Sequence, residues 1–275
     1  MITCIRLKDL NTIQQLRDDY LSTLVAPADG WWEGAIIAHS TFWMIQDEEQ
    51  FAGYYCVGAD NYLLRFYLLE RYQHRAQGIF RWVIATNDIQ CAIAGTIEPL
   101  YLSLCLDLQI SSTPHIYLFR DHTRIEPPSN LGISSFRKAE ERELNEIMRF
   151  YQANIEGAGE SLEAFLSKRL KRAELFVGYA QQTLITTGEC IPSQKQTPYA
   201  DLGMVVAKSY RGRGVGSFTL MQLKKHCYAA GWTPICSCSV DNHASKKAIE
   251  KAGFISEHKM VKITFSSSAT IETIQ

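Results

Sequence analysis

Short apolar runs alternate along the second half of the chain with segments in which apolar residues recur every three or four positions. The runs predict strands, and the wider spacing predicts amphipathic helices. One such helix, over residues 139–155, places Leu144, Ile147, Met148 and Tyr151 on one face. Strands are predicted over residues 133–137, 175–180, 183–191, 199–206 and 235–240, and further helices over 161–173 and 215–230. With another helix and strand at the end, the predicted order is βααβββαβαβ.

The first half repeats part of this pattern. Residues 61–83 again pass from an apolar run through a polar loop into a helical pattern, and residues 91–108 are predicted to form the strand that follows. The loop at residues 72–78 contains a single glycine, Gly78. Two interpretations of residues 1–120 therefore stay open: a degenerate repeat of the second-half domain, or an unrelated α/β domain.

A polar segment separates the two halves. Residues 120–132 combine charged side chains with two adjacent prolines and a glycine, which is the composition of a linker. We therefore predict a domain at residues 1–120, a linker at 121–132 and a second domain at 133–275.

The segment at residues 204–217 joins an apolar strand to a helix through a loop rich in arginine and glycine. Gly212, Gly214 and Gly216 allow the backbone to approach a ligand closely and to adopt φ values that a β-carbon would forbid. The N-terminus of the helix and the two arginines of the loop add positive charge. This combination predicts a site for a pyrophosphate group.

Two known phosphate-binding motifs fit this loop incompletely. A Walker A loop requires a lysine before its Ser or Thr, and no lysine precedes Ser217. A dinucleotide-binding fingerprint requires Gly or Ala at the position of Ser217, although Asp241 ends the next strand at a tolerable distance. An NAD-dependent oxidoreductase is therefore an alternative, but it would need another βαβ unit after Asp241, for which too little chain remains.

Residues 211–216, Arg-Gly-Arg-Gly-Val-Gly, match the pattern Gln/Arg-x-x-Gly-x-Gly/Ala. The features that accompany this match downstream are the strand at 235–240, the spacing Asn242-x-x-Ser245 and the pair Gly253-Phe254. Together they resemble the GNAT superfamily of N-acetyltransferases over about residues 133–265. The resemblance implies an α/β (α+β) GNAT fold, a mixed central sheet flanked by helices. If the first half is a degenerate repeat, the chain holds two tandem GNAT-like domains.

The resemblance further implies an enzyme that transfers the acetyl group of acetyl-CoA to a primary amine, on a small molecule or on a larger acceptor. In this family two strands diverge beside the loop, so that free backbone groups can pair with the pantetheine chain. The residues that the resemblance assigns to acetyl-CoA binding are Met204, Val205, Val206, Arg211, Gly212, Arg213, Gly214, Val215, Gly216, Ser217, Asn242 and Ser245. The amide of Val205 or Val206 is expected to meet the thioester carbonyl.

Two carboxylates, Glu189 and Asp201, occur on predicted strands beside this loop. Either can take the amine proton directly or through water. Glu189 is the preferred catalytic base, because it lies near a strand end that faces the expected acceptor cleft.

The tyrosine with which many family members protonate the leaving thiolate is missing, because Ile249 stands in its place. The remaining candidates for that proton are His243, Tyr228, Ser245 and water. The missing tyrosine also supports a second functional class, a non-catalytic acyl-CoA-binding or sensor protein.

Composition and charge agree with an acetyl-CoA enzyme. Of the 275 residues, 46% are hydrophobic, and neither a membrane span nor a signal peptide is apparent, so a cytoplasmic location is expected. Residues 1–132 hold 9 basic and 15 acidic side chains, whereas residues 133–275 hold 19 and 14, so the basic half carries the loop. The net charge of −1 disfavours a nucleic-acid partner. The eight cysteines lack C-x-x-C spacing, so neither a disulfide framework nor a metal site is expected.

Overall fold

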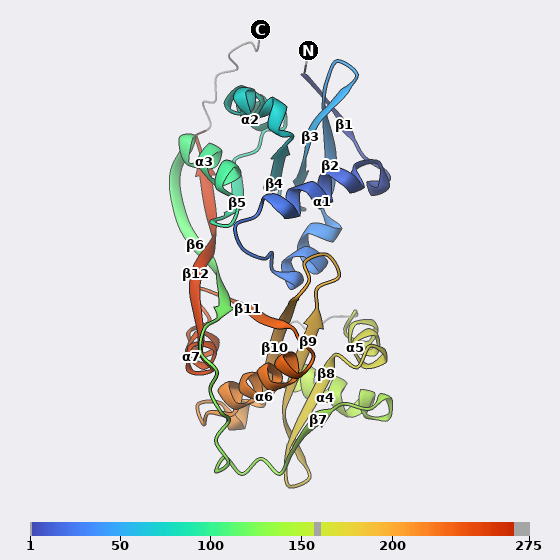
Figure 1. The fold of residues 1–275 in the computed structure, drawn as a ribbon, viewed down its shortest axis with the longest axis vertical. Coiled ribbons are helices and arrows are strands. Elements are labelled where there is room, and N and C mark those ends of the chain that lie inside the picture. Colours follow the sequence, from blue (N-terminus) through green and yellow to red (C-terminus); the bar gives the residue numbers. More distant parts are fainter. Residues whose placement is uncertain (1, 157–160, 267–275) are drawn as a thin grey trace. The chain divides into compact units, whose positions relative to one another are not determined.

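The computed structural model describes residues 2–156 and 161–266, which fall into two units (Figure 1). Unit 1 contains the described residues up to Tyr117 and those from His258 onward, and unit 2 contains the described residues between them. The predicted division into 1–120, 121–132 and 133–275 differs from this one in two respects. All of the predicted linker belongs to unit 2, and the chain returns to unit 1 within its last strand.

Unit 1 is built on a sheet in which the strand order is β1-β2-β3-β4-β5-β12. Its strands are β1 (Ile2–Arg6), β2 (Thr41–Asp47), β3 (Gln50–Val57), β4 (Tyr62–Leu68), β5 (Cys91–Gly95) and the end of β12 (Phe254–Phe265). Its helices include α1 (Gln14–Thr23), α2 (Ala76–Thr86) and α3 (Pro99–Asp107), and the long strand β6 (Gln109–Asp121) follows them. β4 and β5 are parallel, and the other neighbouring strands of this order are antiparallel.

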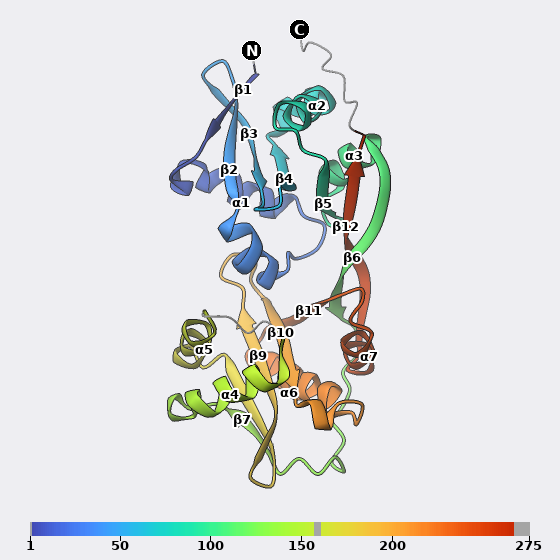
Figure 2. The same ribbon diagram turned by 180° about the vertical axis from the view of Figure 1, so that it is seen from behind.

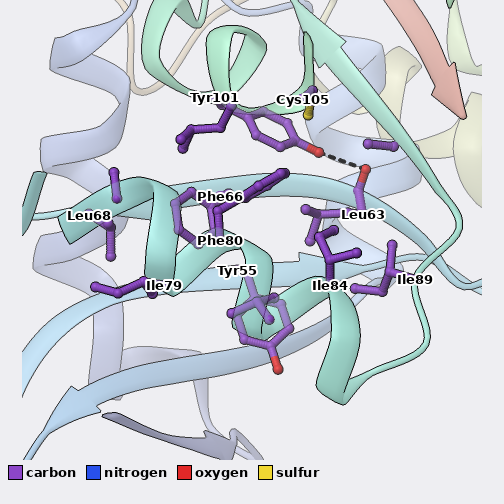
Figure 3. Close-up of a cluster of buried hydrophobic side chains, with 14 of the residues drawn as sticks. Tyr55, Leu63, Phe66, Leu68, Ile79, Phe80, Ile84, Ile89, Tyr101 and Cys105 are labelled. Carbon is purple, nitrogen blue, oxygen red and sulfur yellow. Dashed lines mark hydrogen bonds between the residues drawn. The ribbon is translucent and has the colours of Figure 1, made fainter. Parts of the chain in front are cut away.

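An apolar core of unit 1 lies between the sheet and helices α2 and α3 (Figure 3). Phe66 from β4 and Phe80 from α2 make an edge-to-face contact with ring centres 5.1 Å apart. Tyr101 from α3 donates its hydroxyl proton to the carbonyl of Leu63 at 2.8 Å. The polar end of this buried ring is therefore satisfied, which its burial requires.

The structure corrects two predictions for the first half. The strand predicted over residues 91–108 is wrong beyond Gly95, because Pro99 begins helix α3. Proline is favourable in the first turn of a helix, and the apolar run after it is equally typical of a buried helix. The loop predicted at residues 72–78 is also wrong, because a short 3₁₀ helix over Glu70–Arg75 leads directly into α2.

Unit 2 has the strand order β7-β8-β9-β10-β11. Its strands are β7 (Ser135–Lys138), β8 (Leu175–Ala180), β9 (Thr183–Pro192), β10 (Tyr199–Val206) and β11 (Thr233–Ser239). Its helices are α4 (Leu144–Asn154), α5 (Leu162–Lys171), α6 (Val215–Ala229) and α7 (His243–Lys251). With β12 at its end, the order of these elements is βααβββαβαβ, which confirms the prediction.

Helices α4 and α5 cover one face of the unit 2 sheet, and α6 covers the other (Figures 1 and 2). Ile147 of α4 and Leu166 of α5 share a core with Val177 of β8. On the opposite face, a β-carbon on Gly188 of β9 would come within 3.0 Å of Leu223 on α6. Because side chains alternate along a strand, the neighbours of Gly188 point towards α4 and α5.

The two units share one arrangement. In unit 1, helix α2 connects the parallel strands β4 and β5, and in unit 2, helix α6 connects the parallel strands β10 and β11. This architecture supports the interpretation of the first half as a repeat. Within the described residues, no helix combines the length and the apolar character needed to cross a membrane.

A buried lysine ties helix α6 to the segment that follows β6. Lys224 is 1% exposed, and its Nζ donates to the carbonyls of Thr123 at 2.7 Å and Ala252 at 2.9 Å. The same Nζ lies 2.6 Å from Oδ1 of Asp121. The adjacent Gly253 has φ +88, and a β-carbon there would meet the Thr123 carbonyl oxygen at 2.1 Å. Residues of the predicted linker are therefore a structural part of unit 2.

We expect replacement of Asp121 by Asn to destabilise the protein by about 3 kcal/mol, because a buried ammonium would lose its counter-charge. Urea unfolding measures this loss. Lys225→Met is the matched control, because the neighbouring Lys225 pairs with Glu126 at the surface and should contribute less than about 0.5 kcal/mol. Equal unfolding midpoints for the Asp121 variant and the unmodified protein would contradict this account.

Candidate functional site

The segment between β10 and α6, residues 207–214, contains two left-handed glycines. Gly212 has φ +74 and Gly214 has φ +87, a region that side chains rarely adopt. Gly214 is the N-cap of α6 and offers no side chain to cap it. The first amides of the helix have no carbonyl one turn earlier to bond. An anion at this end of α6 can therefore accept several amide protons and is favoured by the helix dipole.

Gly216 allows close packing, and its predicted contact with a cofactor stays a prediction. It lies within α6, and a β-carbon on it would come 2.9 Å from Sδ of Met204 and 3.4 Å from Cβ of Ala248. Its lack of a side chain thus lets the start of α6 approach β10 and α7. Ser217 is 3% exposed and donates its hydroxyl proton to the Gly214 carbonyl at 2.9 Å, so this hydroxyl stabilises the first turn.

The cations of the loop are held in different ways. Arg211 donates to the carbonyl of Asn154 at 2.7 Å and to that of Val206 at 3.3 Å, so it fixes the loop against the ends of α4 and β10. The guanidinium of Arg213 lies over the ring of Tyr210, 5.4 Å from its centre. Lys251 was missed by the sequence analysis: its Nζ lies 4.0 Å from the position that a β-carbon on Gly214 would take.

Strands β10 and β11 pair only at one end. Tyr199–Asp201 are parallel partners of Thr233–Ile235, although both strands continue beyond this pairing. On its other side, β10 stays paired with β9 as far as Val206. The end of β10 therefore presents an open edge on the side of β11, as the resemblance implies.

The ladder with β9 decides which backbone groups of β10 face this open edge. The amide of Ala207 donates to the carbonyl of Ile185 at 2.9 Å. Because residues of an antiparallel ladder alternate between bonded and non-bonded positions, Val205 directs its backbone groups to β9 as well. Met204 and Val206 direct theirs to the open edge. This geometry corrects the prediction for the Val205 amide and leaves that of Val206 as the candidate to meet a carbonyl.

Asn242 caps helix α7. Its side-chain oxygen accepts the amide proton of Ser245 at 3.0 Å, so the Asn-x-x-Ser spacing forms a helix cap. Contact between these two residues and a cofactor stays a prediction. Ile249 of the same helix is 2% exposed and belongs to the core.

Glu189 of β9 lies on the face covered by α4 and α5, opposite Gly203 of β10. Tyr151 of α4 donates its hydroxyl proton to Oε1 of Glu189 at 2.8 Å. Burial raises the pKa of the Glu189 carboxyl, and the hydrogen bond from Tyr151 and the charge of Arg169 oppose this rise. The group therefore has the properties of a base that can hold and release a proton.

Asp201 lies on the same face, because it pairs with Ile191, two residues beyond Glu189. The structure thus brings the two predicted carboxylates to one surface of the β9–β10 pair.

Tyr228, a candidate proton donor, is engaged elsewhere: its hydroxyl donates to Asp121 Oδ2 at 2.7 Å. Tyr151 was missed in the sequence because its position on a helical face marked it only as a core residue.

The segment before α2 in unit 1, which corresponds to the segment before α6 in unit 2, lacks the left-handed turn of Gly214. Matching Gly78 to Gly216 places Ala76 at the position of Gly214, and Ala76 has the right-handed φ of −56. The segment is accordingly a 3₁₀ helix whose amides bond within the chain, as that of Tyr72 does to the Leu69 carbonyl. The chain therefore does not turn at Ala76 as it does at Gly214, and the amide of Ala76 bonds to the Gln73 carbonyl.

The same match places Arg65 of unit 1 at the position of Gly203. Arg65 is 3% exposed and opposes Cys56, as Gly203 opposes Glu189. Its guanidinium forms an ion pair with Glu33 and lies 4.0 Å from the centre of the Tyr20 ring. An internal cation therefore occupies the position at which unit 2 has Gly203.

Comparisons with known proteins match each half of the chain separately. A family model described as "Acetyltransferase (GNAT) domain" matches residues 9–122, and another described as "Acetyltransferase (GNAT) family" matches residues 137–254. An acetyltransferase from the GNAT family of Colwellia psychrerythraea is 29% identical, with a TM-score of 0.90 over 96% of this chain and 100% of that one. No curated protein gave a significant match.

Two more distant structures share the fold. A GCN5-related N-acetyltransferase from Sphaerobacter thermophilus is 15% identical, with a TM-score of 0.66 over 95% of this chain and 94% of that one. A tandem GNAT protein from the clavulanic acid biosynthesis pathway is 13% identical, with a TM-score of 0.61 over 98% and 99% of the two chains. The two family models, one in each half, show a tandem arrangement of two GNAT domains in this chain.

We expect Gly214→Val to weaken acetyl-CoA binding on the order of a hundredfold, because two charge-assisted hydrogen bonds of about 1.5 to 3 kcal/mol would be lost. A β-branched residue cannot hold φ +87 without strain, so the amides of the loop would turn away. Calorimetry measures the affinity. Gly231→Val is the matched control, because Gly231 has φ +75 with open space around it at the other end of α6. Equal affinities in the two variants would contradict the assignment of the loop.

Proposed function

Because the chain belongs to the GNAT superfamily of acetyltransferases, we propose that it transfers the acetyl group of acetyl-CoA to a primary amine, and that unit 2 carries the reaction. The observation that carries this proposal is the half-buried carboxyl of Glu189, which lies opposite β10 while the far edge of β10 is open. One strand thereby borders both a carboxylate and an edge that no neighbouring strand pairs.

Acetyl-CoA binding in this proposal depends on the loop and on the open edge. The first amides of α6 would hold the pyrophosphate, with Arg213 and Lys251 supplying positive charge nearby. The backbone groups of Met204 and Val206 would pair with the pantetheine chain as a neighbouring strand would. The amide of Val206 would then polarise the thioester carbonyl.

Glu189 would act as the general base. An aliphatic amine is mostly an ammonium at neutral pH, because its pKa is about 10, and the ion cannot attack a carbonyl. The carboxylate would take one proton of the ammonium, and the neutral nitrogen would bond to the carbonyl carbon and lose its second proton to water. The carbon–sulfur bond would break, so that CoA leaves as a thiolate. Burial raises the pKa of Glu189, which makes it a stronger base than an exposed carboxylate.

A second candidate, a non-catalytic acyl-CoA-binding protein, is favoured by one observation. Ile249 occupies the position at which many family members have the tyrosine that protonates the leaving thiolate. Its side chain cannot donate a proton, so acetyl transfer by this chain would need water for that step. The two functions differ in turnover. A library of primary amines, incubated with acetyl-CoA and assayed for release of free thiol, separates them: thiol release with an amine supports the transferase, and binding without release with any amine supports the sensor.

On an amine found in this way, we expect Glu189→Gln to lower kcat by about a hundredfold to ten-thousandfold, the range for removal of a general base. Acetyl-CoA affinity should stay near that of the unmodified protein, because the carboxyl lies away from the loop. The loss should shrink as pH rises, since a larger fraction of the amine is then already neutral. Asp201→Asn is the paired variant, and a larger loss there would transfer the role of base to Asp201.

We also expect one acetyl-CoA to bind per chain. Unit 1 has Ala76 where unit 2 has the left-handed Gly214, and its segment before α2 is helical. Calorimetric titration of the full chain measures the stoichiometry. A second site that survives in the Gly214→Val variant would place cofactor binding in unit 1 and refute this expectation.

A further inference from the structure

The carboxyl of Glu189 is held at only one of its two oxygens. Oε1 accepts the proton of Tyr151, whereas Oε2 has no hydrogen-bond partner among the residues that the structure describes. Oε2 lies 3.9 Å from the position that a β-carbon on Gly203 would occupy. The glycine thus leaves room over β10 on the side of the free oxygen.

A second hydroxyl fixes the direction of this hydrogen bond. Thr187 Oγ1 donates to the hydroxyl oxygen of Tyr151 at 3.3 Å, and Thr187 is fully buried. A phenol has one proton, and its oxygen accepts from Thr187, so that proton is directed to Glu189. The chain Thr187 to Tyr151 to Glu189 therefore has one polarity, and each bond strengthens the next.

We propose that Tyr151 is a positioning residue of the acetyl-transfer site: it holds one oxygen of Glu189 so that the other stays directed over β10 towards the acceptor amine. This inference rests on the proposed role of Glu189 as the base. Tyr151 is 3% exposed and comes from α4, so the packing of that helix fixes its ring. The carboxylate is thereby ordered before an acceptor arrives.

The titratable groups that act on Glu189 are Tyr151 of α4, Arg169 of α5 and Glu174, which precedes β8. Asp201 of β10 lies on the same face of the sheet. Arg169 is itself paired with Glu174 at 2.7 Å, so much of its charge is balanced. The hydrogen bond from Tyr151 stabilises the ionised form of Glu189, and its removal raises the pKa of that carboxyl.

The test compares the full-length Tyr151→Phe variant with Tyr179→Phe. Tyr179 is the matched control because its phenol also donates to carboxylates, Glu143 at 3.1 Å and Glu146 at 3.0 Å, and these lie outside the site. Carbon-13 NMR of the side-chain carboxyls follows the titration of Glu189, which is assigned by the signal lost in Glu189→Gln. We expect the pKa of Glu189 to rise in Tyr151→Phe and to stay unchanged in Tyr179→Phe.

Thr187→Val gives a second route that leaves the phenol in place, and it should raise the pKa of Glu189 by less. On the amine found by thiol release, Tyr151→Phe should lower kcat about tenfold, leave the KM for acetyl-CoA within about twofold and move the acidic limb of kcat/KM to higher pH. A Glu189 titration unaffected by Tyr151→Phe would overturn the positioning role. A shifted titration in a protein that turns over no amine would uphold the hydrogen-bond chain and refute the acetyltransferase proposal alone.

Discussion

The pairing of β10 with β9 is the constraint on which the candidate site depends. An antiparallel ladder assigns backbone groups to alternate sides and side chains to alternate faces. On β10 this sends the backbone of Met204 and Val206 to the open edge, and the side chain of Met204 towards α6. The odd-numbered positions turn to the face of Glu189. A shift of the register by one residue would turn the backbone groups of Met204 and Val206 to β9 and would exchange the faces of all the side chains of β10. The register therefore defines the candidate site as a whole.

The two units show how few residues separate the candidate site from a closed core. Unit 1 keeps the strand, the helix and the parallel pairing, yet Ala76 allows the chain to continue as a helix where Gly214 turns it. Arg65 stands where unit 2 has Gly203, together with the partners of its charge. Both replacements give unit 1 internal contacts at positions that belong to the candidate site in unit 2.

Much of unit 2 was predictable from its sequence, because its elements are marked by clear local signals. The apolar run over Tyr199–Val206 and the glycines before α6 gave the right boundaries and the position of the loop. The apolar run after Gly95 carried no such signal, since buried helices and buried strands have similar composition. Tyr151 and Lys224 were beyond prediction for another reason: their roles depend on partners distant in the sequence, Glu189 and Asp121.

The membership of β12 in both units affects the order in which the protein can fold during synthesis. Met260–Thr264 pair with Cys91–Gly95, so β5 has to wait for a partner made more than 160 residues later. Unit 1 begins to emerge from the ribosome before unit 2, but its sheet stays one strand short until Met260–Thr264 have been translated. Domains usually fold as they emerge, the N-terminal one first. Here the first-made half is completed last, and its β5 edge stays exposed to chaperones, or to wrong partners, throughout that interval.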